Sequence, residues 1–159
     1  IRDDLPKKSS RQKVLSAENV REWLNTYARK PDYENVHIVT FIVSLDGFLW
    51  INERRSEHVL CANGQPPLSA GEMSFAMDDD DIIVVGVTNQ STGYCPEPSS
   101  WIAVETALSK TDIVHPVGFD PAYDFRLCDT CETINIVKDS WFVCANCDAE
   151  LPKTWNFGE

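Results

Sequence analysis

Two Cys-x-x-Cys pairs near the C-terminal end constrain this chain of 159 residues more than any other feature. The first pair is Cys128 and Cys131, the second is Cys144 and Cys147, and twelve residues separate the pairs. A Cys-x-x-Cys loop can direct two sulfur atoms toward one point. Apolar and polar residues alternate on either side of a polar turn between the pairs, which predicts a short antiparallel hairpin with strands at 134–137 and 141–143. Such a hairpin brings the two loops together at one end.

Four thiolates that meet in this way predict a structural metal site. Zinc binds thiolate sulfur at about 2.3 Å in tetrahedral geometry, and four sulfur ligands leave no position for a water molecule. Residues 125–157 resemble a zinc ribbon, a small metal-bound hairpin that serves many unrelated functions. The resemblance implies one structural Zn²⁺ per chain and covers about a fifth of the sequence. It implies nothing about what the protein does.

Other uses of four cysteines remain open at the level of sequence. Two disulfides are one alternative, although a reducing compartment disfavours them. A thioredoxin-like redox pair is another, but such a pair usually occurs singly and begins a helix after a strand. An iron–sulfur cluster also uses four cysteines. The paired spacing and the expected hairpin favour zinc over these alternatives.

The charge of the chain limits its partners. The formal net charge is −11, and residues 31–159 contain six Lys or Arg residues against twenty-one Asp or Glu residues. Nucleic-acid affinity depends largely on cationic contacts with phosphates, so nucleic-acid binding through this acidic body is disfavoured and a protein partner is expected. The basic N-terminal arm, with Lys7, Lys8, Arg11 and Lys13, is the exception. No run of residues is apolar enough for a membrane span, so we expect a soluble, cytoplasmic protein without membrane contact.

Hydrophobic periodicity predicts an α+β domain over residues 16–118, with a mostly antiparallel sheet and two helices. Residues 1–15 are polar and predict a flexible basic lead-in, and Ser16 is a candidate N-cap for the first helix. Apolar runs separated by turn residues predict four or five strands. The predicted strands cover residues 36–44, 48–51, 57–61, 71–76 and 82–87, and the second helix covers residues 101–110. Residues 119–159 form the zinc-ribbon module, which we expect to pack on this domain.

The segment between the last predicted strand and the second helix is rich in polar turn residues. Its order of strand, polar turn and helix start places backbone N–H groups near a helix N-terminus, where anions and carbonyl oxygens bind favourably. A small-ligand pocket at this turn is therefore one hypothesis. The candidate ligand-binding residues are Glu72, Asn89, Ser91, Thr92 and Tyr94.

Several short pieces of this central region match, in the same order, a unit found in other proteins: Ala70-Gly71-Glu72, Asn89, Ser91, Gly93-Tyr94 and Pro96. With them, residues 56–115 resemble in part the Ser-Gly-His-Tyr-containing unit of plant IQ-motif calmodulin-binding proteins and of bacterial toxin-associated proteins. The resemblance implies an antiparallel sheet with a helix packed against it. Thr92-Gly93 stands here in place of the Gly-His pair of that unit, and the sequence contains no IQ motif, so calmodulin binding does not carry over.

A catalytic use of the remaining cysteines is an alternative. Cys95 and His115 are candidates for a Cys-dependent hydrolase or transferase, in which the imidazole generates the thiolate. No nucleophile signature surrounds Cys95, and a single cysteine before a proline is usually a small hydrophobic residue. His58, Cys61 and Cys95 are candidates for a second metal site, without close spacing. The acidic run 78–81 lacks the alternation of a calcium-binding loop.

These observations predict a non-catalytic zinc-binding protein-interaction module, such as an adaptor, an immunity-type partner or a subunit of a complex. One alternative is a small-ligand-binding protein or a Cys-dependent enzyme that uses the turn from Asn89 to Pro96. Another is nucleic-acid binding through the ribbon and the basic N-terminal arm. Likeness of fold does not decide between them.

Overall fold

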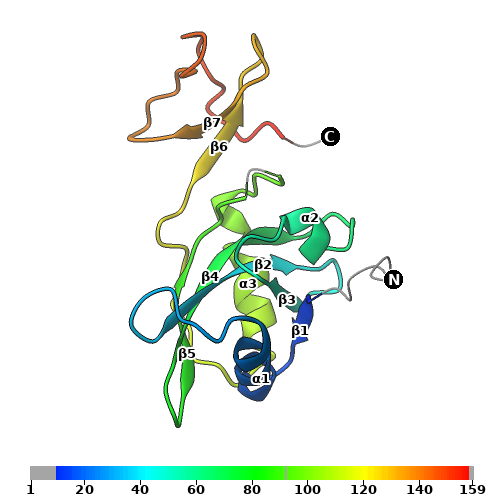
Figure 1. Cartoon of the computed structure of the whole chain (residues 1–159). Coiled ribbons are helices and arrows are strands. Elements are labelled where there is room, and N and C mark those ends of the chain that lie inside the picture. Colours follow the sequence, from blue (N-terminus) through cyan, green and yellow to red (C-terminus); the bar gives the residue numbers. More distant parts are fainter. Residues whose placement is uncertain (1–9, 92, 158–159) are drawn as a thin grey trace, which may run out of the picture.

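A five-stranded antiparallel sheet forms the core of the protein, and a two-stranded sheet lies beyond one end of it (Figure 1). The computed structural model describes residues 10–91 and 93–157. The strand order in the larger sheet is β1-β3-β2-β4-β5, with bounds β1 (Gln12–Val14), β2 (Val36–Val43), β3 (Leu49–Asn52), β4 (Ser69–Met77) and β5 (Ile82–Val87). The helices are α1 (Ala17–Tyr27), α2 (His58–Cys61) and α3 (Trp101–Leu108), and a 3-10 turn, η1 (Pro98–Ser100), leads into α3. The α+β class and the mostly antiparallel sheet are confirmed.

Helices α1 and α3 cover one face of the larger sheet, and the short helix α2 lies on the other face. The first face contains the main core, where buried residues of both helices pack with Phe41 and its neighbours in the sheet. On the second face, Cys61 and Ala62 pack against Ile42 and Ala70. Because Phe41 and Ile42 are successive residues of β2, their side chains point to opposite faces, and β2 therefore contributes to both layers.

Strand β2 and helix α1 form where the sequence predicts them. Seven of the eight residues of β2 are buried, which agrees with a run of β-branched and aromatic residues at the centre of a sheet. Helix α1 begins after Ser16, whose hydroxyl accepts a hydrogen bond of 3.2 Å from the Asn19 N–H. The buried face of the helix carries Val20, Trp23 and Leu24. Both elements are therefore specified by local residue pattern.

The predicted hairpin at Asp46-Gly47 is also confirmed. Gly47 has a φ of +85°, a left-handed conformation that favours glycine. The turn joins β2 to β3, which pair with Phe41 opposite Ile51. The Ser44 hydroxyl hydrogen-bonds the Asp46 carboxylate inside the turn, and this bond lowers the pKa of Asp46.

The segment predicted as a third strand is instead helix α2. The N–H groups of Cys61 and Ala62 donate to the carbonyl oxygens of Glu57 and His58, at 3.2 and 2.8 Å. The prediction of a strand at 57–61 is therefore wrong. A run of five residues is too short to distinguish a helical period from a strand period. Packing of the segment against the second face of the sheet decides its conformation.

Part of the range that the sequence assigns to a flexible basic lead-in forms regular structure. Gln12–Val14 form β1, an edge strand that pairs with β3, so this part of residues 1–15 is regular structure. The guanidinium of Arg11 lies 3.7 Å from the centre of the Trp50 ring, and the Lys13 ammonium lies 4.3 Å from that of Phe48. Lys7 and Lys8 lie outside the described residues.

Gly71 lies where β4 approaches the chain that follows β5. A Cβ atom on Gly71 would lie 1.8 Å from the carbonyl oxygen of Thr88, far inside van der Waals contact. The Thr88 N–H donates to the Glu72 carbonyl oxygen at 2.8 Å, so the two segments stay hydrogen-bonded beyond the last residue of β5. The pairing of β4 with β5 also shifts register between Ser74 and Phe75. Only glycine fits position 71 without moving the backbone.

The chain between α3 and the two-stranded sheet is fastened to the core. The Asp120 N–H donates to the Val87 carbonyl oxygen at 2.8 Å. Three residues further on, the Tyr123 backbone exchanges two hydrogen bonds with the Asn89 side chain. The two-stranded sheet, β6 (Asp124–Leu127) and β7 (Ile134–Val137), follows directly. Its first strand therefore starts from a fixed point on the core.

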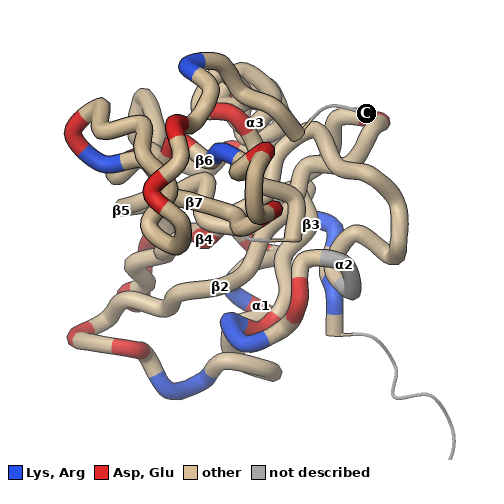
Figure 2. The backbone as a smooth tube through the Cα atoms, turned by 90° about the horizontal axis from the view of Figure 1, so that it is seen from above, with Lys and Arg blue, Asp and Glu red and all other residues tan. Residues whose placement is uncertain are grey.

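The chain carries a formal net charge of −11. Figure 2 marks the positions of Asp and Glu and of Lys and Arg along the described backbone. None of the helices within residues 10–91 and 93–157 is both long enough and apolar enough to cross a membrane.

Candidate metal centre

The first Cys-x-x-Cys pair forms the turn between β6 and β7. These strands pair antiparallel, with Phe125 opposite Ile136, and the chain between them contains Cys128 and Cys131. The Cys128 N–H donates to the Thr133 carbonyl oxygen at 2.9 Å, and the Glu132 N–H donates back to the Cys128 carbonyl oxygen at 2.8 Å. Glu132 has a φ of +63°. The two bonds close a compact loop that holds both sulfurs on one side.

The second pair repeats this arrangement. The Cys144 N–H donates to the Ala149 carbonyl oxygen at 2.8 Å, and the Asp148 N–H donates to the Cys144 carbonyl oxygen at 2.9 Å. Asp148 has a φ of +65°, at the position equivalent to that of the left-handed residue in the first loop. An isolated bridge between Val143 and Glu150 closes the base. Each cysteine pair is therefore held by its own loop of the same design.

The hairpin around these loops differs in part from the one predicted. Residues 134–137 do form a strand, but its partner is β6, which precedes the first cysteine pair. Residues 141–143 form no strand, apart from the single bridge at Val143. Trp141 is exposed, whereas Phe142 and Val143 are both half-buried, so burial does not alternate here as it would in a paired strand. The first cysteine loop is thus the turn of a hairpin, and the second follows it in the chain.

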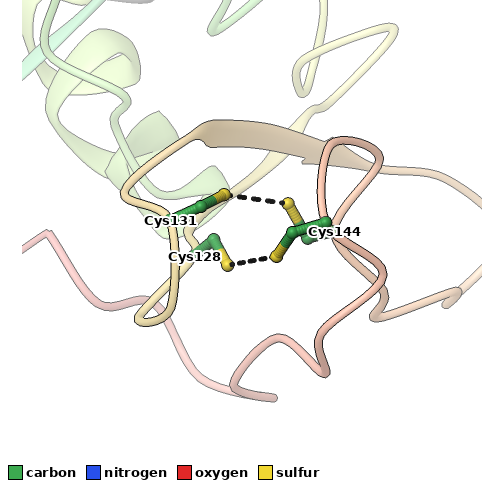
Figure 3. Close-up of side chains that lie close together, drawn as sticks. Cys128, Cys131 and Cys144 are labelled. Carbon is green, nitrogen blue, oxygen red and sulfur yellow. Dashed lines mark hydrogen bonds between the residues drawn. The ribbon is translucent and has the colours of Figure 1, made fainter.

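The four sulfur atoms lie within 4.8 Å of one another. Two closer pairs, each with one sulfur from each loop, are separated by 3.6 Å: Cys128 with Cys147 and Cys131 with Cys144 (Figure 3). A tetrahedral ion with sulfur ligands at about 2.3 Å separates its ligands by about 3.8 Å. A disulfide requires about 2.05 Å, and all four cysteines are free thiols here. The cluster can therefore hold a metal ion, and the disulfide alternative does not describe this structure.

Two asparagines direct N–H groups at the sulfur atoms. The Asn146 backbone N–H lies 3.3 Å from the Cys144 sulfur, and its side-chain N–H lies 3.4 Å from the Cys131 sulfur. The Asn135 side chain donates to the Cys144 sulfur at 3.5 Å and accepts a hydrogen bond from the Ala145 N–H at 3.0 Å. Such donors stabilise thiolate over thiol, as metal binding requires. The sequence prediction missed both residues; Asn146 lies between two cysteines, whereas nothing in the sequence marks Asn135.

The hydrogen-bond donors change the acidity of the thiols. Hydrogen bonds with the Asn146 and Thr133 side chains lower the pKa of Cys131 to about 6. Desolvation raises the pKa of Cys144, but N–H donors outweigh it and lower the pKa overall. At Cys147 the Ala149 N–H lowers the pKa, but desolvation and the three neighbouring sulfurs raise it to about 12. Four sulfurs this close cannot all become anionic without a cation between them.

A small apolar cluster and a buried arginine hold the module together. Cys128 and Cys144 are buried with Val137 and Leu151, and Phe142 packs against this group. The guanidinium of Arg126, 7% exposed, donates to the carbonyl oxygens of Pro152 and Lys153 at 3.1 and 2.9 Å. Its central carbon lies 5.5 Å from the centre of the Phe142 ring. The C-terminal tail is thereby tied to β6.

Cys95 and His115, the candidate catalytic pair, lie in different surroundings. Cys95 is 2% exposed, and burial raises its pKa to about 11. Its carbonyl oxygen accepts a hydrogen bond of 2.7 Å from the Trp155 indole N–H. The His115 imidazole lies 2.8 Å from the Pro116 carbonyl oxygen and packs edge-on against the Trp101 ring. A thiol with a raised pKa is a poor nucleophile at neutral pH.

We expect Cys95 to resist alkylation in the folded protein. A pKa of about 11 leaves roughly one thiol in a thousand ionised at pH 8, and the thiolate is the reactive form. Iodoacetamide treatment followed by peptide mass spectrometry measures the rate, which should rise about tenfold per pH unit up to that pKa. Cys61, whose pKa burial raises to about 12, is the internal control. Rapid labelling of native Cys95 at pH 8 would instead favour the Cys-dependent enzyme.

The candidate ligand residues at the central turn are largely engaged within the protein. Asn89 is fully buried, and its amide N–H₂ donates to the carbonyl oxygens of Pro96 and Tyr123 at 2.9 and 2.8 Å. Its amide oxygen accepts a 2.7 Å bond from the Tyr123 N–H. Ser91, 2% exposed, accepts a 3.3 Å bond from the Tyr94 N–H. These side chains join the turn to the linker that leads into β6.

The remaining candidates at this turn are placed differently. Glu72 lies on β4, where its carboxylate is 3.9 Å from the Arg54 guanidinium. Tyr94 is half-buried, and its hydroxyl donates to the Gln65 carbonyl oxygen at 3.3 Å. Thr92 lies outside the described residues. Tyr94 borders a pocket that is also lined by Trp155 of the C-terminal tail.

The other polar candidates have structural partners. The His58 Nε2 lies 2.8 Å from the Gly71 carbonyl oxygen, so this nitrogen carries a proton, and burial lowers the pKa of His58. The second metal site proposed from His58, Cys61 and Cys95 is not formed, because the cluster of Cys128, Cys131, Cys144 and Cys147 is the one group of metal-ligating side chains that converges within the described ranges. The Asp78 carboxylate accepts hydrogen bonds from the Asp80 and Asp81 N–H groups, as expected for a hairpin tip.

Comparisons with known proteins add no relative. No protein-family model matches the chain, no curated protein matches its sequence, and no solved structure matches its fold. The resemblance of residues 56–115 to the unit of plant and bacterial proteins therefore receives no support from them. What the chain can bind follows from its own geometry, of which the four-cysteine cluster is the most specific part.

Proposed function

We propose that the protein is a non-catalytic module that holds one structural Zn²⁺ and acts by binding another protein. The observation that carries the proposal is the convergence of four sulfur atoms within 4.8 Å from two loops of equal design. A site with four sulfur ligands has no open position for substrate or water, so the ion stabilises the fold rather than reacting. Hydrogen bonds from Asn135 and Asn146 to sulfur support a thiolate site.

Binding is favoured over catalysis by the state of the two remaining cysteines. Burial raises the pKa of Cys61 to about 12 and that of Cys95 to about 11, so both thiols are protonated at neutral pH. Among the residues of the central turn, Asn89 and Ser91 use their side chains to hold the backbone. Small zinc-bound hairpins are stable, rigid surfaces, and the chain's net charge of −11 favours a basic partner.

Nucleic-acid binding is the less favoured alternative. Of the four cations that the sequence offers for it, Lys7 and Lys8 lie outside the described residues. Arg11 lies against the Trp50 ring, and Lys13, on the edge strand β1, lies against the Phe48 ring. Lysine on an edge strand is a common device against edge-to-edge aggregation. The remainder of the molecule repels phosphate.

Metal analysis of the full chain tests the proposal. Protein purified under reducing conditions should contain one zinc per chain by inductively coupled plasma mass spectrometry. Replacement by Co²⁺ should give the absorption spectrum of a tetrahedral tetrathiolate site. Protein with no metal, or with iron and the visible absorption of an iron–sulfur cluster, would contradict the zinc assignment. For the binding half, elution of the chain from a native extract of its source only at its own mass of 17.9 kDa would count against a partner.

A further inference from the structure

We infer that the pocket between the core and the C-terminal tail binds a proline-rich, arginine-flanked segment of a partner protein. This inference names the partner class for the proposed interaction module and rests on that proposed function. The pocket has a volume of about 230 Å³. Its apolar walls are formed by Pro66, Pro67, Leu68, Tyr94, Pro96 and Trp155.

The pocket is assembled from three distant parts of the chain. The segment before β4 and the segment from Tyr94 through η1 supply most of the lining residues, and the tail that follows the cysteine cluster supplies Trp155. The indole N–H of Trp155 donates to the Cys95 carbonyl oxygen at 2.7 Å, which fixes the ring against the turn. Pockets at the junction of two structural units are frequent ligand sites.

The tail is held in place by the ribbon, so the ribbon positions the tryptophan wall. The Asn156 side chain bonds to both backbone groups of Leu127, accepting from the N–H at 2.9 Å and donating to the carbonyl oxygen at 2.7 Å. Arg126 binds the tail carbonyl oxygens of Pro152 and Lys153. Strand β6 of the metal-bound hairpin thus anchors the tail on both sides of Thr154 and Trp155. The rigid Trp155 ring is therefore available before a partner arrives, which lowers the entropy cost of binding.

The chemistry of the walls selects proline. The rings of Tyr94 and Trp155 and the three prolines beside them provide flat apolar surfaces. Aromatic-lined grooves recognise polyproline II segments, whose pre-formed backbone loses little entropy on docking. Such segments lack proline N–H groups and present carbonyl oxygens, which need hydrogen-bond donors. The exposed Ser99 hydroxyl is one such donor, whereas the single Tyr94 hydroxyl proton is already donated to the Gln65 carbonyl oxygen.

The charge around the pocket selects basic flanks. Glu97 is exposed and is the charged residue among the described residues that line the pocket. The net charge of −11 adds a long-range attraction for cations. An arginine beside the proline run can pair with Glu97, whereas an acidic flank is repelled. Charge complementarity therefore distinguishes a basic proline-rich segment from other extended peptides.

Fluorescence anisotropy with a labelled peptide tests the inference. The probe is a fluorescein-labelled hexaproline peptide with arginines at both ends, titrated with the full zinc-loaded chain. We expect saturable binding that Tyr94→Ala weakens by about tenfold or more and Leu68→Ala weakens by a similar factor, because buried aromatic and aliphatic anchors dominate such interfaces. Tyr94→Phe should bind nearly as well as the wild type. Glu97→Gln should cause a smaller loss and reduce the dependence on salt.

Matched controls separate this site from general attraction. Tyr33→Ala removes a tyrosine that is 54% exposed and lies outside the pocket, so it should bind the peptide as the wild type does. A peptide of equal charge in which Ser and Gly replace the prolines should bind at least about tenfold more weakly. The inference is overturned if the folded chain shows no saturable binding, if the control peptide binds equally well, or if Leu68→Ala and a folded Tyr94→Ala leave affinity unchanged.

Zinc measured on the same samples keeps the two proposals apart. A chain that contains one zinc but ignores the peptide contradicts the pocket and leaves the zinc module standing. A chain that binds the peptide without zinc supports the pocket and contradicts the metal assignment.

Discussion

A Cys144→Ser variant is expected to lose its bound metal and the protected structure of the two-stranded sheet, while the five-stranded sheet keeps its fold. The Cys144 sulfur is buried and receives hydrogen bonds from Asn135 and Asn146. Structural zinc sites of this kind contribute an apparent folding free energy on the order of 10 kcal/mol, and a serine hydroxyl does not replace a thiolate ligand. Amide hydrogen exchange measured by mass spectrometry should show fast exchange across β6, β7 and the tail, with β2 still protected.

The neighbouring residue provides a matched control. Ala145→Ser adds a hydroxyl at an exposed position beside the same loop and leaves all four sulfurs in place, so exchange should match the wild type. A chelator added to the wild type should reproduce the pattern of the Cys144→Ser variant. Slow exchange in β6 and β7 of Cys144→Ser would show that the apolar cluster and Arg126 hold the module without metal.

A Gly71→Ala variant is expected to show the largest loss of stability in the core. The added Cβ atom would lie 1.8 Å from the carbonyl oxygen of Thr88, and because the obstacle is backbone no side chain can rotate away. Overpacking of this kind costs about 3 kcal/mol or more. For a chain of this size that loss lowers the melting temperature by roughly 6–12 °C, measured by circular dichroism. To relieve this clash, β4 should move away from the chain after β5, which weakens the hydrogen bond from the Thr88 N–H to the Glu72 carbonyl oxygen.

A second glycine of the same sheet is the control for this variant. A Cβ atom on Gly86 would have the Ser74 side chain as its nearest neighbour, at 3.9 Å, which is an ordinary contact. Gly86→Ala should therefore leave the melting temperature within about 2 °C of the wild type. Equal melting temperatures for Gly71→Ala and Gly86→Ala would mean that the sheet yields at Thr88 without cost.

The elements that could be predicted are those with a local chemical cause. The run of β-branched residues in β2, the Ser16 cap of α1 and the Asp46-Gly47 turn each fix a conformation through neighbouring residues alone. The cysteine spacing belongs to the same class, because two short loops and a connecting segment limit where the sulfurs can go. All four correspond to observed structure, and the convergence of the sulfurs follows from the spacing of Cys128 and Cys144 with their partners.

What could not be predicted depends on contacts between distant segments. Helix α2 forms from a five-residue run whose conformation is set by packing on Ile42 and Ala70. The partner of β7 is decided by where the linker leaves the core at Tyr123, and no residue near β7 encodes that. The pocket lined by Trp155 exists because its indole reaches a carbonyl oxygen sixty positions earlier in the chain. The periodicity of hydrophobic residues carries no information about contacts between segments that lie this far apart in the sequence.

The equal design of the two cysteine loops determines how the protein can capture an ion. Each loop is closed by its own pair of backbone hydrogen bonds, which brings its two sulfurs to one side. Once one loop has bound an ion, closure of the twelve-residue segment between the pairs is enough to bring the sulfurs of the other loop to that ion. The entropy of such a closure grows slowly with length, and the tether keeps the second pair at high effective concentration. The two loops therefore act as one chelator whose grip depends little on the length of chain between them.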